Sequence, residues 1–255
     1  MCRYNTHVSF PRVFWSVGDP VGGVAAVTGD EAHHLRQVLR VQPGTRVGLF
    51  DGRGHEWIGT VDDVTKQVVQ VIGLTPAVPV AESRVSVTLA VGVLKGDQMD
   101  TVVRDATMLG VTSIVPVRTA HVSVPARAWQ SGAAQQRWQR VAVASAGQCR
   151  RAVVPTVRPV ADFDACLSEA VALRLICLEP TVHSAVGNVL PEDWRTGEPP
   201  ASVQVLVGPE GGWSMAEVEQ ALAAGAKAVS LGPRTLRAET APLVALTLVS
   251  ATWGW

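Results

Sequence analysis

The sequence contains few lysines, few cysteines and no long hydrophobic run. Lys66, Lys95 and Lys227 are its only lysines, and 22 basic residues balance 22 acidic ones, so no net charge points to a polyanionic partner. Its four cysteines show neither a C-x-x-C pair nor metal-ligand spacing. No segment approaches the ~18 apolar residues of a membrane span, and MCRYNTHVSFPR lacks the apolar core of a signal peptide. We therefore predict a cytoplasmic protein with reduced thiols, without a metal and without a membrane partner.

Acidic residues are also missing from one long stretch. Between Asp105 and Asp162 there is no Asp or Glu, while basic and aromatic side chains continue. The arginines there are Arg118, Arg127, Arg137, Arg140, Arg150, Arg151 and Arg158, accompanied by His121, Trp129 and Trp138. Because guanidinium groups bind phosphate oxygens well, this local positive charge favours nucleic acid. The alternative is a solvated helix face paired with acids from elsewhere in the fold.

The first part of the chain predicts a small β-barrel. Short β-type runs lie at 45–50, 56–61 and 67–72. DGRG at 51–54 is a hairpin signal, and one helix is expected from Asp30 to Arg40. Two prolines and weak periodicity mark LTPAVPVAESR at 74–84 as a linker. The predicted bounds are 1–75 for the barrel, 76–84 for the linker and 85–255 for a second domain.

The second part alternates strands and helices. Strands are expected at 85–94, 112–117, 173–178, 203–207 and 228–231. Helices are expected at 96–110, at 132–149, from a capping box at Ser214 and Glu217 to Gly225, and at about 239–253. This alternation predicts an α/β fold with a parallel sheet, in which ligands bind at the carboxyl ends of the strands. The last helix is apolar nearly all round, so either a subunit interface or the domain core must cover it.

Two loops at those strand ends share one design. In LVGPEGGW at 206–213, an apolar strand ends at Gly-Pro and is followed by Glu210. In LGPRTLRAET at 231–240, an apolar strand again ends at Gly-Pro and is followed by Arg234, Arg237 and Glu239. A single such loop is most simply a tight turn. Two of them at one edge of a sheet favour a ligand pocket between them. Since neither G-x-G-x-x-G nor a P-loop lysine is present, the residues indicate a nucleoside-like ligand, and S-adenosylmethionine offers an adenine, a ribose diol and a cation together.

At these motifs the sequence resembles the bacterial 16S ribosomal RNA uridine-N3 methyltransferases, which belong to the SPOUT class. The resemblance rests on both loops, on KGDQMDTVVRDATMLGVTSIVPV at 95–117 and on RWQRVAVASAGQC at 137–149. It extends to PRVF at 11–14, GDEAHHLRQVLRVQPG at 29–44 and LFDGRG at 49–54, which are similar to the family's PUA-like RNA-binding barrel. The matches follow the expected order over nearly the whole chain.

The resemblance implies a trefoil knot in the second domain, a homodimer, and S-adenosylmethionine as methyl donor for the 16S rRNA of the small ribosomal subunit. Carried over by motif, the donor-binding residues are Leu178, Gly208, Glu210, Gly211, Leu231, Gly232, Leu236, Arg237 and Glu239. Met108 and Gly147 depart from the family pattern, because the family usually has an acid at each position. The loss of these acids is expected to change ion pairing and dimer packing more than the chemistry.

Methylation of N3 requires an extruded base, loss of the N3 proton and stabilisation of the resulting anion. We predict Glu239 as base or as the residue that orients the substrate edge, and Arg237 or Arg234 as the group that stabilises the anion. The alternative is that Arg237 and Glu239 only pair and cap the last helix. RNA contacts are predicted for Arg12, His33, His34, Arg36 and Arg40, against the alternative of a solvated helix face. A ribose 2′-hydroxyl methyltransferase and a non-catalytic RNA-binding module remain the rival functions.

Overall fold

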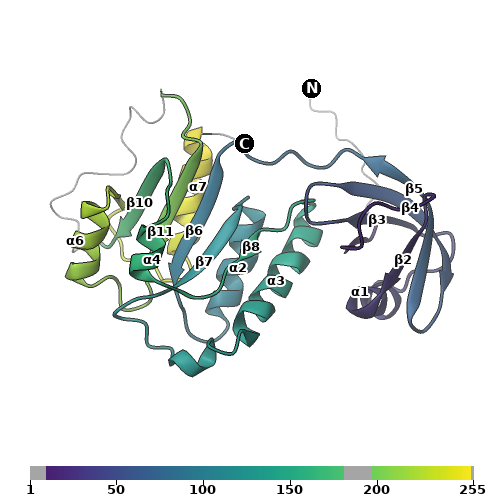
Figure 1. Ribbon diagram of the computed structural model, residues 1–255, viewed down its shortest axis with the longest axis horizontal. Coiled ribbons are helices and arrows are strands. Elements are labelled where there is room, and N and C mark those ends of the chain that lie inside the picture. The colour runs from purple at the N-terminus through teal and green to yellow at the C-terminus, as the bar shows by residue number, and fades with distance from the viewer. Residues whose placement is uncertain (1–9, 181–196, 254–255) are drawn as a thin grey trace. The chain divides into compact units, whose positions relative to one another are not determined.

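Residues 10–180 and 197–253 are described by the computed structural model, and they divide into two units (Figure 1). The smaller unit holds the described residues up to Val80 together with Ala146–Val153. The larger unit holds Ala81–Ser145 and the described residues from Val154 onward.

The smaller unit is a curled sheet of five strands in the order β1-β3-β4-β5-β2. Its strands are β1 (Arg12–Phe14), β2 (Ala25–Thr28), β3 (Arg46–Phe50), β4 (Glu56–Val64) and β5 (Val68–Ala77). Among these described strands, β1 and β3 pair in parallel and the other neighbours pair antiparallel. Alternate side chains of β4 and β5, such as Val61, Val69 and Val71, point into one core that also contains the edge-to-face rings of Trp15 and Trp57.

The larger unit contains the parallel sheet that the sequence predicts, in the order β12-β10-β11-β6-β7-β8, with β9 paired to β7. The strands are β6 (Ser86–Gly92), β7 (Ser113–Arg118), β8 (Thr156–Val157), β9 (Ala161–Asp162), β10 (Leu173–Leu178), β11 (Ser202–Val207) and β12 (Lys227–Ser230). The helices are α2 (Gln98–Met108), α3 (Ala133–Cys149), α4 (Phe163–Leu167), α6 (Met215–Ala223) and α7 (Ala241–Trp253).

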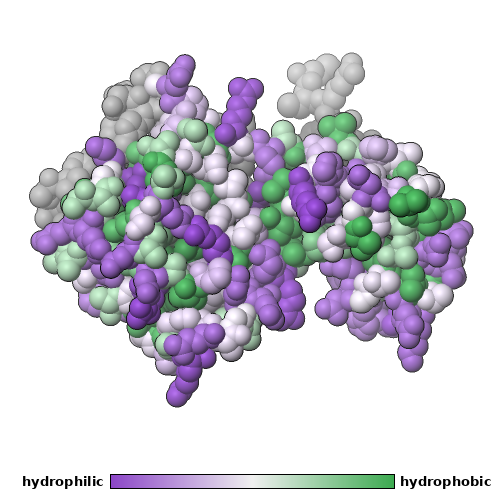
Figure 2. All heavy atoms as spheres, viewed as in Figure 1, coloured by the Kyte–Doolittle hydropathy of each residue, from purple (hydrophilic) through white to green (hydrophobic). Residues whose placement is uncertain are grey.

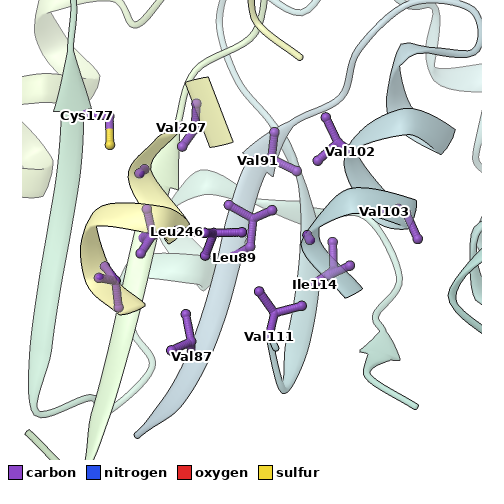
Figure 3. Close-up of a cluster of buried hydrophobic side chains, with 14 of the residues drawn as sticks. Val87, Leu89, Val91, Val102, Val103, Val111, Ile114, Cys177, Val207 and Leu246 are labelled. Carbon is purple, nitrogen blue, oxygen red and sulfur yellow. The ribbon is translucent and has the colours of Figure 1, made fainter. Parts of the chain in front are cut away.

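The helices cover both faces of this sheet. Odd-numbered side chains of β6, such as Leu89, belong to one buried cluster with side chains of α2, α3 and α7 (Figure 3). Leu246 of α7 and Val102 of α2 point toward Leu89 in that view. Even-numbered residues of β6, β10 and β11, such as Ala90 and Ile176, belong to a second cluster with α4 and α6. Burial on both faces explains why these strands are continuous apolar runs rather than alternating ones.

Several elements differ from the sequence prediction. The strands β1, β2, β8 and β9 and the helix α4 were not expected, and all of them are short. The predicted linker at 74–84 is wrong at its start, because β5 continues to Ala77 and pairs Pro76 with Trp57. The predicted helix to Arg40 is wrong at its end. An α-helical turn, α1 (Gly29–His33), passes into a π-helical turn, η1 (His34–Val38), and Arg40 has a φ of 51° that is outside any helix.

Candidate functional site

Three strand ends bring the candidate site together. The strands β12, β10 and β11 are neighbours and run in the same direction, so the loops that follow them leave one edge of the sheet (Figure 1). The sequence predicts this edge for the loops after β11 and β12. The structure adds Glu179 and Pro180, which directly follow β10, the strand that lies between them.

These loops enclose a cavity of about 420 Å³. All the residues predicted for donor binding line it, namely Leu178, Gly208, Glu210, Gly211, Leu231, Gly232, Leu236, Arg237 and Glu239, and so does Arg234. The volume lies within the range of ~300–1,000 Å³ that is usual for small-molecule sites. The structure therefore gathers the predicted residues at one place, while their roles remain predictions.

The glycines of the two loops permit turns and close packing. Gly212 has a φ of 67° and its N–H donates to the carbonyl oxygen of Pro209 at 2.9 Å, which closes a turn. A Cβ at Gly211 would lie 2.8 Å from the Cβ of His121, so no larger residue fits there without displacement. The glycine-rich sequence is thus required by the shape of the cavity wall.

Polar contacts fasten the cavity wall to the rest of the unit. The carboxylate of Glu210 accepts a hydrogen bond from the backbone N–H of Lys95 at 3.0 Å, and the indole of Trp213 donates to the carbonyl oxygen of Cys177 at 3.1 Å. The capping box predicted at Ser214 and Glu217 is present. It begins α6 directly after the loop, and this fixes the end of the glycine-rich turn.

The ion pair between Arg237 and Glu239 at the cavity is loose. Arg237 and Glu239 approach to 3.9 Å, and their side chains are 85% and 21% exposed. The other oxygen of Glu239 accepts a hydrogen bond from the amide nitrogen of Gln98 at 3.3 Å. The backbone carbonyl of Arg237 accepts from the N–H groups of Thr240 and Ala241, so the main chain at this residue shapes the start of α7. The guanidinium is left directed to solvent and able to meet a ligand.

Sequence reasoning missed several residues that line the cavity, including Gln98, Cys177, Glu179 and Trp213. Glu179 directly follows β10, and its place at a strand end was the signal that could have found it. Gln98 has no such signal, because it reaches the cavity from the first turn of α2, 141 residues before Glu239. Burial raises the pKa of the Cys177 thiol to about 12, so this thiol stays protonated at neutral pH and is no nucleophile.

The arginine-rich stretch is partly neutralised by acids from outside it, as the alternative interpretation held. Arg118 pairs with Asp162, Arg137 with Asp100 and Arg158 with Glu169. Arg151 is buried, at 5% exposure. The local positive charge is therefore smaller than the seven arginines of the sequence indicate. In the part of the chain that the structure describes, Arg127 and Arg140 are exposed and form no ion pair with an acid.

Arg12, a predicted RNA contact, has a structural role instead. Its side chain is 5% exposed and forms a two-pronged pair with Glu56 at 2.8 and 3.0 Å. Its remaining nitrogen donates to the carbonyl oxygens at the end of α3, with Gly147 at 3.0 Å. Since its donors are directed to these acceptors, the guanidinium has none to offer to a phosphate in this arrangement.

The other predicted RNA contacts lie on one surface of the smaller unit. His33, His34 and Arg40 are exposed, and Arg36 is half-buried. They follow one another along α1, η1 and the residues after it. Because of the π-helical turn and the positive φ of Arg40, they do not lie on the single helix from Asp30 to Arg40 that the sequence predicts.

No cluster of three or more His, Cys, Asp or Glu side chains able to hold a metal occurs in the part of the chain that the structure describes. Among the same residues, no helix is both long enough and apolar enough to cross a membrane. In Figure 2 the drawn faces of both units carry hydrophilic residues intermixed with hydrophobic ones.

Comparison with known proteins gives consistent matches. A family model described as an RNA methyltransferase domain matches residues 81–250, and one described as an RNA methyltransferase PUA domain matches residues 27–72. Ribosomal RNA small subunit methyltransferase E of Synechocystis sp. is 30% identical over 237 residues, which are 91% of this chain and 74% of that protein.

Two solved structures are similar over nearly their whole length. A methyltransferase from Legionella pneumophila in complex with the bound cofactor SAM has a TM-score of 0.86 and 29% identity, covering 96% of this chain and 98% of that one. A ribosomal RNA small subunit methyltransferase E from Neisseria gonorrhoeae bound to S-adenosyl methionine has a TM-score of 0.84 at the same identity and coverage.

Proposed function

The chain belongs to the RNA methyltransferase family whose model matches residues 81–250, and from this premise we propose that it transfers a methyl group from S-adenosylmethionine to N3 of a specific uridine in 16S ribosomal RNA. The observation that carries the proposal is the cavity at the ends of β10, β11 and β12, because every residue carried over from the resemblance lines it. A relative that matches 91% of this chain is named a ribosomal RNA small subunit methyltransferase E, and so is one of the two similar structures, both of which have S-adenosylmethionine bound.

The residues present fit this methyl donor. Leu178, Leu231 and Leu236 offer apolar surface for an adenine, and the turn at Gly212 lets backbone approach a ribose closely. Carboxylates of Glu210 and Glu239 border the same space and suit the positive charge of a sulfonium or an α-ammonium. When bound, S-adenosylmethionine supplies an electrophilic methyl group.

The chain's own residues then handle the uridine. N3 must lose a proton before it can attack, and the exposed Arg237 is placed to stabilise the negative charge that develops on the base. Glu239 accepts that proton or holds the pairing edge, and Gln98 keeps one of its oxygens in place. Arg234 lines the same rim and supplies a second positive charge.

Substrate RNA is held by both units. In the smaller unit the surface of His33, His34, Arg36 and Arg40 contacts phosphate or ribose, consistent with the PUA-domain match at residues 27–72. Arg12 positions the sheet of that unit rather than the RNA.

The finer architecture follows from the same resemblance. The second domain forms a trefoil knot around the donor, and this is supported by the loops after β11 and β12, which meet the end of β10 at a single cavity. The protein is a homodimer in the cytoplasm, where its ribosomal substrate is found. Only Pro242, Ala245, Leu246 and Val249 of α7 are fully buried, and the half-exposed apolar residues beside them suit a subunit interface.

Methyl transfer from labelled S-adenosylmethionine to unmodified small ribosomal subunits tests the function directly. The label should appear on one uridine of 16S rRNA and should stay with the base after glycosidic cleavage. A label that stays with the ribose identifies a 2′-hydroxyl methyltransferase, and absence of S-adenosylmethionine binding by calorimetry identifies a non-catalytic RNA-binding protein.

The role of Glu239 has its own test. Glu239→Gln keeps the shape of the side chain and removes its charge. We therefore expect kcat to fall by at least tenfold and by at most ~10⁴-fold, which is the largest contribution typical of a catalytic acid or base. Full turnover with normal S-adenosylmethionine affinity would show that Glu239 is not the base.

A further inference from the structure

A second cavity of about 420 Å³ opens at the carboxyl edge of the same sheet, where β7 ends. Its lining includes Arg118, Trp129, Gln130, Gln135, Val160 and Asp162. None of the residues assigned to the methyl-donor site lines it. Proteins with α/β folds bind their ligands at the carboxyl edge of the parallel sheet, so the position of this cavity favours a ligand site.

The lining combines an aromatic ring with polar groups. Trp129 is half-buried and packs against the main core, so its position is held from one side. Gln135 donates its amide hydrogen to the carbonyl oxygen of Val157 at 3.0 Å, which fixes that side chain at the cavity wall. A fixed indole beside amide groups is suited to a nucleobase, which stacks on the ring and bonds through its edge.

The charged pair at this cavity is able to exchange partners. Arg118 and Asp162 approach to 2.5 Å, yet their side chains are 59% and 60% exposed. An ion pair so open to water contributes little, so Arg118 can turn to a phosphate without a large loss. Arg127, which is exposed on the short helix η2 (Ala126–Ala128), adds positive charge two residues before Trp129.

A short segment links this cavity to the methyl-donor site. Two residues after Arg118, the N–H of Ala120 donates to the carboxylate of Glu217 at 2.7 Å. A ring nitrogen of His121 then lies 2.9 Å from the carbonyl oxygen of Gly211, which lines the first cavity. These contacts fix the chain that joins the two sites, so a ligand in one has a set position relative to a ligand in the other.

We propose that the second cavity binds a nucleotide of single-stranded RNA that flanks the target uridine, with its base stacked on Trp129 and its phosphate bound by Arg118. The inference rests on the proposed function and extends it to substrate recognition. Extrusion of the uridine leaves its neighbour without a stacking partner. The indole of Trp129 replaces that partner and so lowers the cost of extrusion.

Steady-state kinetics of the full-length protein on small ribosomal subunits test this role. We expect Trp129→Ala to raise KM for the RNA substrate by roughly 5- to 150-fold, the equivalent of one lost stacking contact, with S-adenosylmethionine affinity unchanged. Trp129→Phe should stay within a few-fold of the parent because stacking is retained. Arg118→Ala should raise KM by less, about three- to tenfold for one charge-assisted contact, and should reduce its salt dependence.

Arg104→Ala is the matched control. Arg104 also pairs with one acid, Asp105, and its side chain is 55% exposed, but it lies on α2 and lines neither cavity. We expect no change in KM. Equal effects of Arg104→Ala and Arg118→Ala would overturn the phosphate contact, and an unchanged KM in Trp129→Ala would overturn the stacking contact.

A binding measurement separates this inference from the proposed function. Titration with single-stranded oligouridylate should quench tryptophan fluorescence, and Trp129→Phe should lose part of that quenching. If the parent protein transfers no methyl group but Trp129 is still quenched, the function fails and the nucleotide site stands. If methylation occurs while Trp129→Phe is quenched like the parent, the nucleotide site is overturned. Equal quenching by uridine monophosphate would show a mononucleotide site and would also overturn it.

Discussion

Two arginine–carboxylate pairs in this chain have the same chemistry and very different settings. In the smaller unit, Arg12 meets Glu56 through two bonds of 2.8 and 3.0 Å, and the side chains are 5% and 11% exposed. In the larger unit, Arg237 meets Glu239 at 3.9 Å, and Arg237 is 85% exposed. Both arginines are predicted from the sequence as functional residues.

The difference shows which guanidinium is free to act. Arg12 also donates to the carbonyl oxygens of Ala146 and Gly147 and lies 4.8 Å from the ring centre of Phe50, so its N–H donors and one face of its guanidinium group are occupied. Arg237 has one distant acid and a cavity beside it. A charge that the fold has already paired cannot be removed without leaving a buried partner unpaired, while one that is only loosely paired at a cavity is available to a substrate.

Removal of the buried arginine should have the largest effect. Arg12→Ala leaves Glu56 without its partner and leaves helix carbonyls without donors, and breaking such a buried pair costs about 3–5 kcal/mol. Urea unfolding followed by the fluorescence of the Trp15–Trp57 pair measures this loss in the smaller unit. Arg53→Ala, at an exposed position in the same unit, should change the free energy by less than about 0.5 kcal/mol. If the two variants lost similar free energies of unfolding, Arg12 would have no special structural role.

Removal of the exposed arginine should act on rate instead. We expect Arg237→Ala to lower kcat by about 10²-fold, or about 2.7 kcal/mol of transition-state stabilisation, because a charge aimed at the developing anion is lost. The free energy of unfolding should stay within about 0.5 kcal/mol of the parent, as for other exposed side chains. Single-turnover methyl transfer and urea unfolding on the same preparation check both values. If Arg237→Ala lost stability but kept the parent's kcat, Arg237 would be a structural residue and not a catalytic one.

Lysine at the two positions should sharpen the comparison with smaller effects. Arg12→Lys keeps the charge but loses the planar fork that binds Glu56 through two bonds, and we expect a loss of about 1.5 kcal/mol in stability. Arg237→Lys retains a positive charge where only a charge is required, so kcat should fall less than tenfold. If lysine at 237 is as harmful as alanine, Arg237 makes a bidentate contact that its loose pairing does not reveal.

The strand ends and the cavity loops were predictable because local chemistry marks them. Gly-Pro after an apolar run ends a strand, and parallel strands end at one edge, so Glu210 and Glu239 could be brought together from the sequence alone. The capping box at Ser214 was equally local and is present. The short strands β1 and β2 carry too few residues to show a period of two, and they were missed.

Tertiary partners account for the remaining errors. Nothing near Arg12 in the sequence indicates that it would meet Glu56, 44 residues away, and the carbonyls of Ala146 and Gly147. Likewise the acids that pair with Arg137 and Arg158 lie outside the acid-free stretch, so its charge could not be summed from the sequence. Burial of a charge depends on which distant segments meet, and that information is absent from local patterns.

A change at the helix end that receives Arg12 should have the smallest effect, and it should be favourable. Gly147 lies within α3, and its backbone oxygen accepts from Arg12. A Cβ there would lie 3.6 Å from the ring of Phe50, which is ordinary contact distance. Gly147→Ala therefore removes a flexible residue from a helix without a clash and should stabilise the smaller unit by about 0.5–1 kcal/mol. The same urea experiment measures it. In the Arg12→Ala background the gain should persist, because helix propensity does not need the arginine, and a gain that disappears would show that this helix end is ordered only through the buried pair.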